Sequence, residues 1–167
     1  DIVVHLRLGD GLCVQDDPYC GRKDLIRDGP RDCWHNTTDC FKQATYAFPQ
    51  EWYESVVQTL KQQNFTATAA PRKMYVVSES AHWTRSKPDP RNGDFSIDDT
   101  YRGNFVHYME QQGFDVHLYQ SGEGTPDDDF SYMCMARTFV QGGGGFSRLI
   151  AGIVRARGNQ VLVPEAV

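Results

Sequence analysis

The apolar positions of this chain fall into short segments with two different spacings. Residues 2–8 and 73–78 form mostly apolar runs with little alternation, which is typical of parallel strands covered on both faces. Residues 49–63 instead place large apolar side chains four positions apart, at Trp52 and again at Val56, with polar residues between them. That spacing predicts an amphipathic helix between the two strands.

The rest of the chain continues this alternation. We expect helices over 98–112, 130–136 and 146–157, and strands over 114–119, 137–141 and 160–163. Strands that alternate with helices predict an α/β, Rossmann-like three-layer domain with a mainly parallel sheet. A length of 167 residues suits one hydrophobic core, so we expect a single domain over 1–167. Because the sequence opens directly on a buried strand, we expect it to begin at a domain edge, with more chain upstream.

Residues 9–48 interrupt the pattern as a long insertion that is rich in Asp, Gly, Pro and Cys and has no sustained period. Four of the five cysteines gather there, at Cys13, Cys20, Cys33 and Cys40. They predict two disulfides, with Cys134 a free thiol. Structural zinc is the alternative, although the intervals of seven, thirteen and seven lack CxxC pairs. Sequons at Asn36 and Asn64 agree with an oxidising lumen of the secretory pathway.

The charge balance narrows the choice of partner. A formal net charge of −5 argues against a general affinity for nucleic acid or for an anionic membrane. No apolar run approaches the roughly 18 residues of a membrane span, so membrane attachment would require an upstream anchor. An anionic ligand would therefore need a local cluster of cationic side chains or other positive groups.

The first candidate for such a site is the segment 5–10, HLRLGD. It places the guanidinium of Arg7 at the end of the first strand, beside a glycine turn that lets a ligand approach. The planar fork of arginine suits phosphate, because it donates two parallel hydrogen bonds and stays charged. The alternative is a structural pair of Arg7 with Asp10, beside a core His5.

The second candidate is the run 142–145 of four glycines, which leads from a predicted strand into Phe146 and Ser147 at a predicted helix start. Free N–H groups at a helix N-terminus bind phosphate, and glycines let its oxygens reach the backbone. A merely flexible turn is the alternative. The run matches neither the P-loop nor the dinucleotide-binding glycine pattern, so an ATPase or an NAD enzyme is not supported.

The acidic residues are weaker candidates for a ligand-binding or metal-binding site. The run Asp127 to Asp129 fits either a carboxylate site for a divalent cation or the N-terminal cap of the next helix. Ser78 ends the strand over 73–78 and Glu79 follows it. The two residues either face the same site or start a solvated loop. The remaining histidines have no metal-ligand spacing and no GxSxG motif occurs, so hydrolases and metalloenzymes are disfavoured. Three arginines are expected on a helix surface, namely Arg148, Arg155 and Arg157.

The segment HLRLGD, together with DDDFSYMCMARTFVQGGGGFSRLIAGIVRARGNQVLV, resembles the fucosyltransferase superfamily of α1,2-, α1,6- and protein O-fucosyltransferases. Their donor-binding C-terminal half opens with a strand that carries HxRRxD. It later has an Asp and, seven residues on, an Ala, followed by a strand that leads to a helix start. Asp129 and Ala136 keep that spacing. The resemblance implies one half of a GT-B-type glycosyltransferase, located in the Golgi or the endoplasmic reticulum.

By this resemblance Arg7 would bind the β-phosphate of GDP-fucose, and Asp129 would hydrogen-bond the guanine edge. The turn Gly144 to Ser147, which includes Gly145 and Phe146, would hold the pyrophosphate. His5 would shape the pocket. Such enzymes are inverting and use neither a metal nor another cofactor, and their partners are the nucleotide-sugar donor and a glycan or glycoprotein acceptor.

The turn that is commonly rich in Ser and Thr in the family is glycine-rich here, and two further positions depart from the family pattern. The second arginine of HxRRxD is Leu8 here, and the carboxylate that some relatives carry eight residues beyond the first arginine is Gln15. These departures favour the alternative of a non-enzymatic lumenal module that keeps the fold and binds a nucleotide or a glycan. A purely structural domain, whose glycines serve only packing, is the third hypothesis.

Overall fold

The structure is a computed structural model that describes residues 1–6, 34, 48–63, 71–78, 95–119 and 126–165. Among these residues it has five strands: β1 (Ile2–Leu6), β2 (Arg72–Ser78), β3 (Phe114–Tyr119), β4 (Thr138–Val140) and β5 (Gln160–Leu162). The helices are α2 (Gln50–Gln62), α3 (Phe95–Gln111), α4 (Pro126–Cys134) and α5 (Gly144–Ala156). None of the described helices is both long and apolar enough to cross a membrane.

The strands form one parallel sheet in the order β3-β2-β1-β4-β5. From β1 the chain moves outward to β2 and β3, and then returns to place β4 on the opposite side of β1. The sheet order therefore reverses between β1 and β4. This arrangement confirms the predicted α/β, Rossmann-like three-layer architecture.

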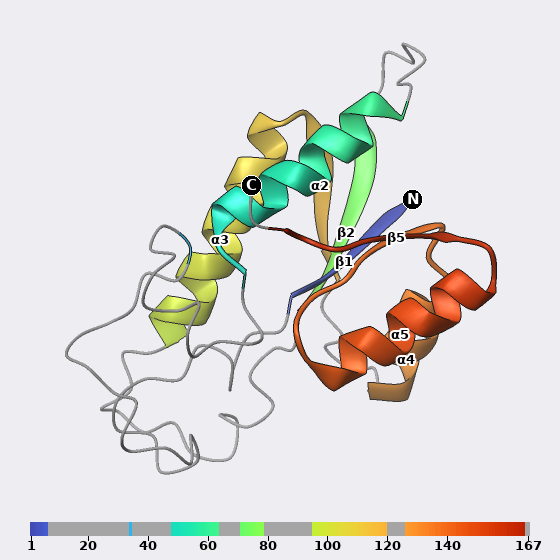
Figure 1. Cartoon of the computed structure of the whole chain (residues 1–167). Helices are drawn as coiled ribbons and strands as arrows, with labels where there is room; N and C mark the ends of the chain where they lie inside the picture. Colours follow the sequence, from blue (N-terminus) through green and yellow to red (C-terminus); the bar gives the residue numbers. More distant parts are fainter. Residues whose placement is uncertain (7–33, 35–47, 64–70, 79–94, 120–125, 166–167) are drawn as a thin grey trace.

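Helices cover both faces of the sheet, with α2 and α3 on one side and α4 and α5 on the other (Figure 1). Alternation along β1 divides its side chains between two cores. Ile2, Val4 and Leu6 pack with α2 and α3, whereas Val3 packs with α4 and α5. All five residues of β1 are buried, as expected for a central strand of a parallel sheet.

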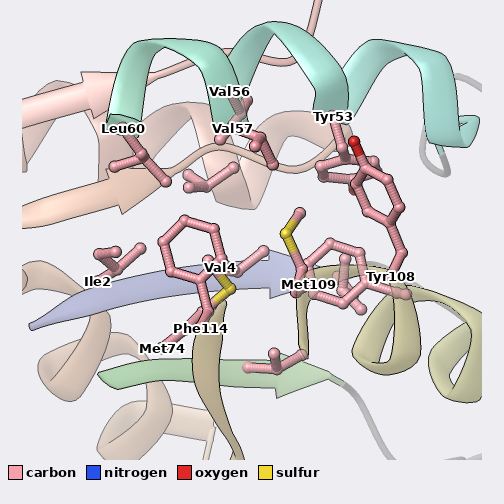
Figure 2. Packing of buried hydrophobic residues seen from close by; sticks show 14 of the residues in the cluster. Ile2, Val4, Tyr53, Val56, Val57, Leu60, Met74, Tyr108, Met109 and Phe114 are labelled. Atoms are coloured by element: carbon pink, nitrogen blue, oxygen red, sulfur yellow. The ribbon is translucent and has the colours of Figure 1, made fainter. Parts of the chain in front are cut away.

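The core under α2 and α3 combines aliphatic and aromatic side chains. Figure 2 shows Val56, Val57 and Leu60 of α2 facing Ile2 and Val4 of β1. The four-residue spacing that predicted this helix is also the spacing of its buried stripe, because positions i and i+4 share one face.

Trp34 is the one described residue within 7–47, and it belongs to this core. It is buried, and its ring contacts Tyr53, Tyr101, Phe105 and Tyr108 at centroid distances of 5.3–5.9 Å. Its carbonyl oxygen accepts a 3.1 Å hydrogen bond from the backbone N–H of Gln50, at the start of α2. The insertion over 9–48 thus contributes a large side chain to the domain core.

Three helix starts differ from the sequence prediction by two residues or more. The first is α3, which begins at Phe95 rather than at residue 98. Pro126 begins α4, so the acidic run lies in its first turn and not before the helix, because proline suits a first helical position. Gly144 begins α5, so the segment Gly144 to Ser147 is the first helical turn rather than a separate loop.

Candidate functional site

The carboxyl ends of β1 and β4 lie next to each other, at the point where the strand order reverses. Open α/β sheets bind ligands at this position, because the loops that follow the two strands run to opposite faces and part there. The described residues at this point are His5 and Leu6 at the end of β1, and Gln141 to Gly143 after β4. This edge is called the carboxyl edge below.

Gly142 lies directly against the end of β1. A Cβ atom built at Gly142 would be 2.2 Å from the carbonyl oxygen of His5 and 3.4 Å from its Nδ1 atom. No side chain fits in that space, so the segment after β4 can approach β1 this closely only with glycine at position 142. Gly142 therefore allows two backbone segments to pack closely, which is a more specific role than that of a flexible turn.

The residues that follow Gly142 form the start of α5. The hydroxyl oxygen of Ser147 accepts a 2.8 Å hydrogen bond from the backbone N–H of Gly142, and Ser147 is completely buried. Gly144 has a φ of +84°, a left-handed conformation that favours glycine. The N-cap residue, Gly143, provides no side-chain cap, and the first turn contains no acidic residue. The first turn of α5 therefore presents backbone N–H groups and a partial positive charge at the carboxyl edge.

An aromatic contact connects α5 with β1. The ring of Phe146 lies 5.8 Å from the ring of His5 in an edge-on arrangement, and His5 is 2% exposed. Phe130 of α4 lies 5.8 Å from Phe146 on the same face of the sheet. Phe146 thus connects the end of β1 to the first half of α4.

Asp129 precedes Phe130 in α4 and differs from its acidic neighbours. Asp127 and Asp128 are exposed, whereas Asp129 is half-buried. The Oδ1 atom of Asp129 is buried and has no hydrogen-bond partner among the described residues. A buried acceptor of this kind loses free energy unless a donor reaches it, so Asp129 is suited to receive an N–H group from a ligand.

Ser78 lies at the same edge on the other face of the sheet. It ends β2, where it is in register with Leu6 of β1, and it is buried. The Nη1 atom of Arg102, from α3, donates to the Ser78 hydroxyl at 3.5 Å. Sequence reasoning missed Arg102, because a polar residue within a predicted helix indicates a solvated face. Its only sequence signal is its place between two aromatic positions of that helix, Tyr101 and Phe105.

The structure therefore brings His5, Phe146 and Ser147 into one contact network around Gly142, and Asp129 precedes Phe130, which contacts Phe146. Gly145 is exposed in the first turn of α5, with open space where a Cβ would lie. Several other candidates lie outside the described residues: Arg7, Asp10, Glu79, Cys13, Cys20, Cys33, Cys40, Asn36 and Asn64. The described part of the chain contains no group of three or more metal-ligating side chains.

A free thiol and two arginines lie at the opposite, amino edge of the sheet. Cys134 ends α4, just before β4 begins, and it is a free, buried cysteine as predicted. Burial raises the pKa of its thiol, and the nearby charge of Arg157 lowers that pKa in part. Arg155 and Arg157 are exposed at the end of α5, and Arg157 donates to the sulfur of Met135 at 3.1 Å. This places both arginines away from the carboxyl edge.

No protein-family model and no curated protein matches this chain. The fold nevertheless defines a general class, the Rossmann-like α/β domains, in which ligands bind at the carboxyl edge.

Proposed function

We propose that this chain is the donor-binding domain of an inverting, metal-independent glycosyltransferase that transfers fucose from GDP-fucose to a glycan or protein acceptor. The observation that carries the proposal is the first turn of α5, which opens without a side-chain cap at the point where the strand order reverses. The choice of GDP as the nucleotide and fucose as the sugar rests on the sequence resemblance to fucosyltransferases.

The diphosphate would lie against the first turn of α5. Backbone N–H groups and the helix dipole stabilise negative charge there, and the exposed Gly145 leaves the backbone accessible. Arg7 follows Leu6, the last residue of β1, directly in the sequence. Its guanidinium would bind a phosphate held at the carboxyl edge.

The guanine base would bind Asp129. Guanine presents two neighbouring N–H donors on one edge, and the buried Oδ1 atom of Asp129 is an acceptor without a partner among the described residues. Uracil offers no comparable pair of donors. The carboxylate would therefore select GDP over UDP, which the phosphate contacts cannot do.

In the transfer step the acceptor hydroxyl oxygen attacks the anomeric carbon as the bond to the β-phosphate oxygen breaks. The bonding electrons stay on the β-phosphate oxygen of the departing GDP, and the acceptor hydroxyl gives its proton to solvent water. Arg7 and the N–H groups of α5 would stabilise the charge that develops on the leaving phosphate. His5, held between Gly142 and Phe146, would fix the shape of the edge on which the phosphates rest.

Calorimetric titration with GDP and UDP, each in EDTA and in Mn²⁺, tests this proposal. We expect binding of GDP in EDTA and weaker binding of UDP. Arg7→Ala should reduce GDP affinity by about 1.5–3 kcal/mol, the range for charge-assisted hydrogen bonds, and Arg7→Lys should recover part of the loss. Asp129→Asn should reduce the preference for GDP over UDP.

Arg155→Ala is the matched control, because Arg155 is exposed at the far end of α5. It should leave GDP affinity within a few-fold of the wild type. Equal affinity for GDP and UDP, or binding only with Mn²⁺, would contradict the GDP-fucose proposal. GDP binding without fucosyl transfer would instead support a non-enzymatic nucleotide-binding module.

A further inference from the structure

We infer that Arg102 is a second phosphate-binding cation of the proposed nucleotide site, held at the carboxyl edge by Ser78. This inference rests on the proposed function, and it adds a residue from a helix that the sequence motifs do not include. Its starting point is the contact between the Nη1 atom of Arg102 and the Ser78 hydroxyl at 3.5 Å.

The position of Ser78 places this guanidinium beside the end of β1. Ser78 is the register partner of Leu6, which directly precedes Arg7. Neighbouring strands of a sheet lie about 4.8 Å apart, so β2 and β4 are about 10 Å apart on either side of β1. One nucleoside diphosphate can span that distance along the carboxyl edge.

The two sides of the edge present complementary groups. Met74 and Val76 of β2 pack with α2 and α3, and alternation places Ser78 on that same face. The ring of His5 and the first turn of α5 lie on the other face. A diphosphate at the edge would therefore meet Arg102 from one face and the N–H groups of α5 from the other.

Packing of α3 holds Arg102 in this place. Its neighbour Tyr101 is buried, and the Tyr101 hydroxyl donates to the carbonyl oxygen of Phe48. Phe105, one turn further along α3, is fully buried against Tyr53 and Trp34. Arg102 itself is half-buried. Its backbone is therefore fixed by the core, so a guanidinium projecting from it is positioned before a ligand arrives.

The charge of the ligand also favours a second cation. The segment 5–10 contains a single guanidinium, that of Arg7, whereas a diphosphate carries more than one negative charge. The planar guanidinium of Arg102 carries five N–H donors, and its Nη1 atom contacts the Ser78 hydroxyl. Such a guanidinium suits phosphate oxygens better than an ammonium group does.

The test compares GDP, GMP and guanosine as ligands for the wild type, Arg102→Ala, Arg102→Lys and Ser78→Ala. We expect Arg102→Ala to weaken GDP binding about tenfold, which corresponds to about 1.4 kcal/mol, and to leave guanosine binding within twofold. Arg102→Lys should recover part of the GDP affinity. Ser78→Ala should cause a smaller loss in the same direction, because the guanidinium remains but is less well positioned.

Arg155→Ala is again the control and should change none of the three affinities. Thermal melting of each variant establishes that it is folded. Equal losses for GDP and guanosine would mean that Arg102 only supports the fold, and this would overturn the inference. Wild-type GDP affinity in Arg102→Ala would overturn it as well while leaving the proposed function in place. Failure of the wild type to bind GDP would overturn both.

Discussion

Replacement of Gly142 by alanine introduces a methyl group where the backbone of β1 already lies. The new Cβ would be 2.2 Å from the carbonyl oxygen of His5, whereas Cβ atoms in proteins essentially never approach other atoms within 3.0 Å. The two backbones must therefore separate by about 0.8 Å, the difference between these distances. His5 cannot yield easily, because β1 is paired with β2 on one side and with β4 on the other.

Overpacking of this kind costs about 1–3 kcal/mol. Alanine also restricts the unfolded chain, which offsets about 0.4–1 kcal/mol of that cost. We therefore expect Gly142→Ala to lower the free energy of unfolding by about 1–2 kcal/mol, and the melting temperature by about 2–8 °C for a chain of this size.

Thermal and urea unfolding, followed by circular dichroism, measure the effect, with Gly152→Ala as the matched control. Gly152 is exposed within α5, and a Cβ there would meet nothing within 4 Å. The same substitution should raise stability by about 0.5–1 kcal/mol at that site, because alanine is the better helix former. A Gly142→Ala protein that melts at or above the wild-type temperature would refute the close contact between β1 and the segment after β4.

Trp34→Ala should destabilise the domain by about 3–5 kcal/mol in urea unfolding, since it removes a buried ring that contacts four others; an unchanged midpoint would mean that Trp34 is not part of this core. Burial raises the pKa of Tyr53 and of Tyr101 well above the usual value for a phenol. The unfolded state therefore loses these protons first, and stability should fall as the pH rises above about 10, with tyrosinate absorbance appearing together with loss of the fold; ionisation of all tyrosines in a still-folded protein would contradict this. Alkylation of the denatured, unreduced protein should label Cys134 alone, because the other cysteines are predicted to be paired; labelling of all five together with bound zinc would favour a metal site.

The elements of this fold could be predicted from the sequence because each has a local signature. In α5, Ile150, Ala151 and Val154 are buried while Arg148 and Arg155 are exposed, and this division follows directly from the period of a helix. The mostly apolar run of β1, with little alternation, likewise predicted a strand covered on both faces. Helix starts were less accurate, because proline and glycine at the starts of α4 and α5 are compatible with both a loop and a first turn.

The site depends on contacts between residues that are distant in sequence. The glycine run predicted a phosphate-binding turn, but only the tertiary structure shows Gly142 against His5, because that contact requires β4 to pair beside β1. The approach of Arg102 to Ser78 likewise depends on how α3 packs across β2. A local pattern encodes which face of a helix or strand is apolar. The order of strands and the partner of each buried polar group follow only from packing all the apolar faces together, and that packing was decided by the whole chain.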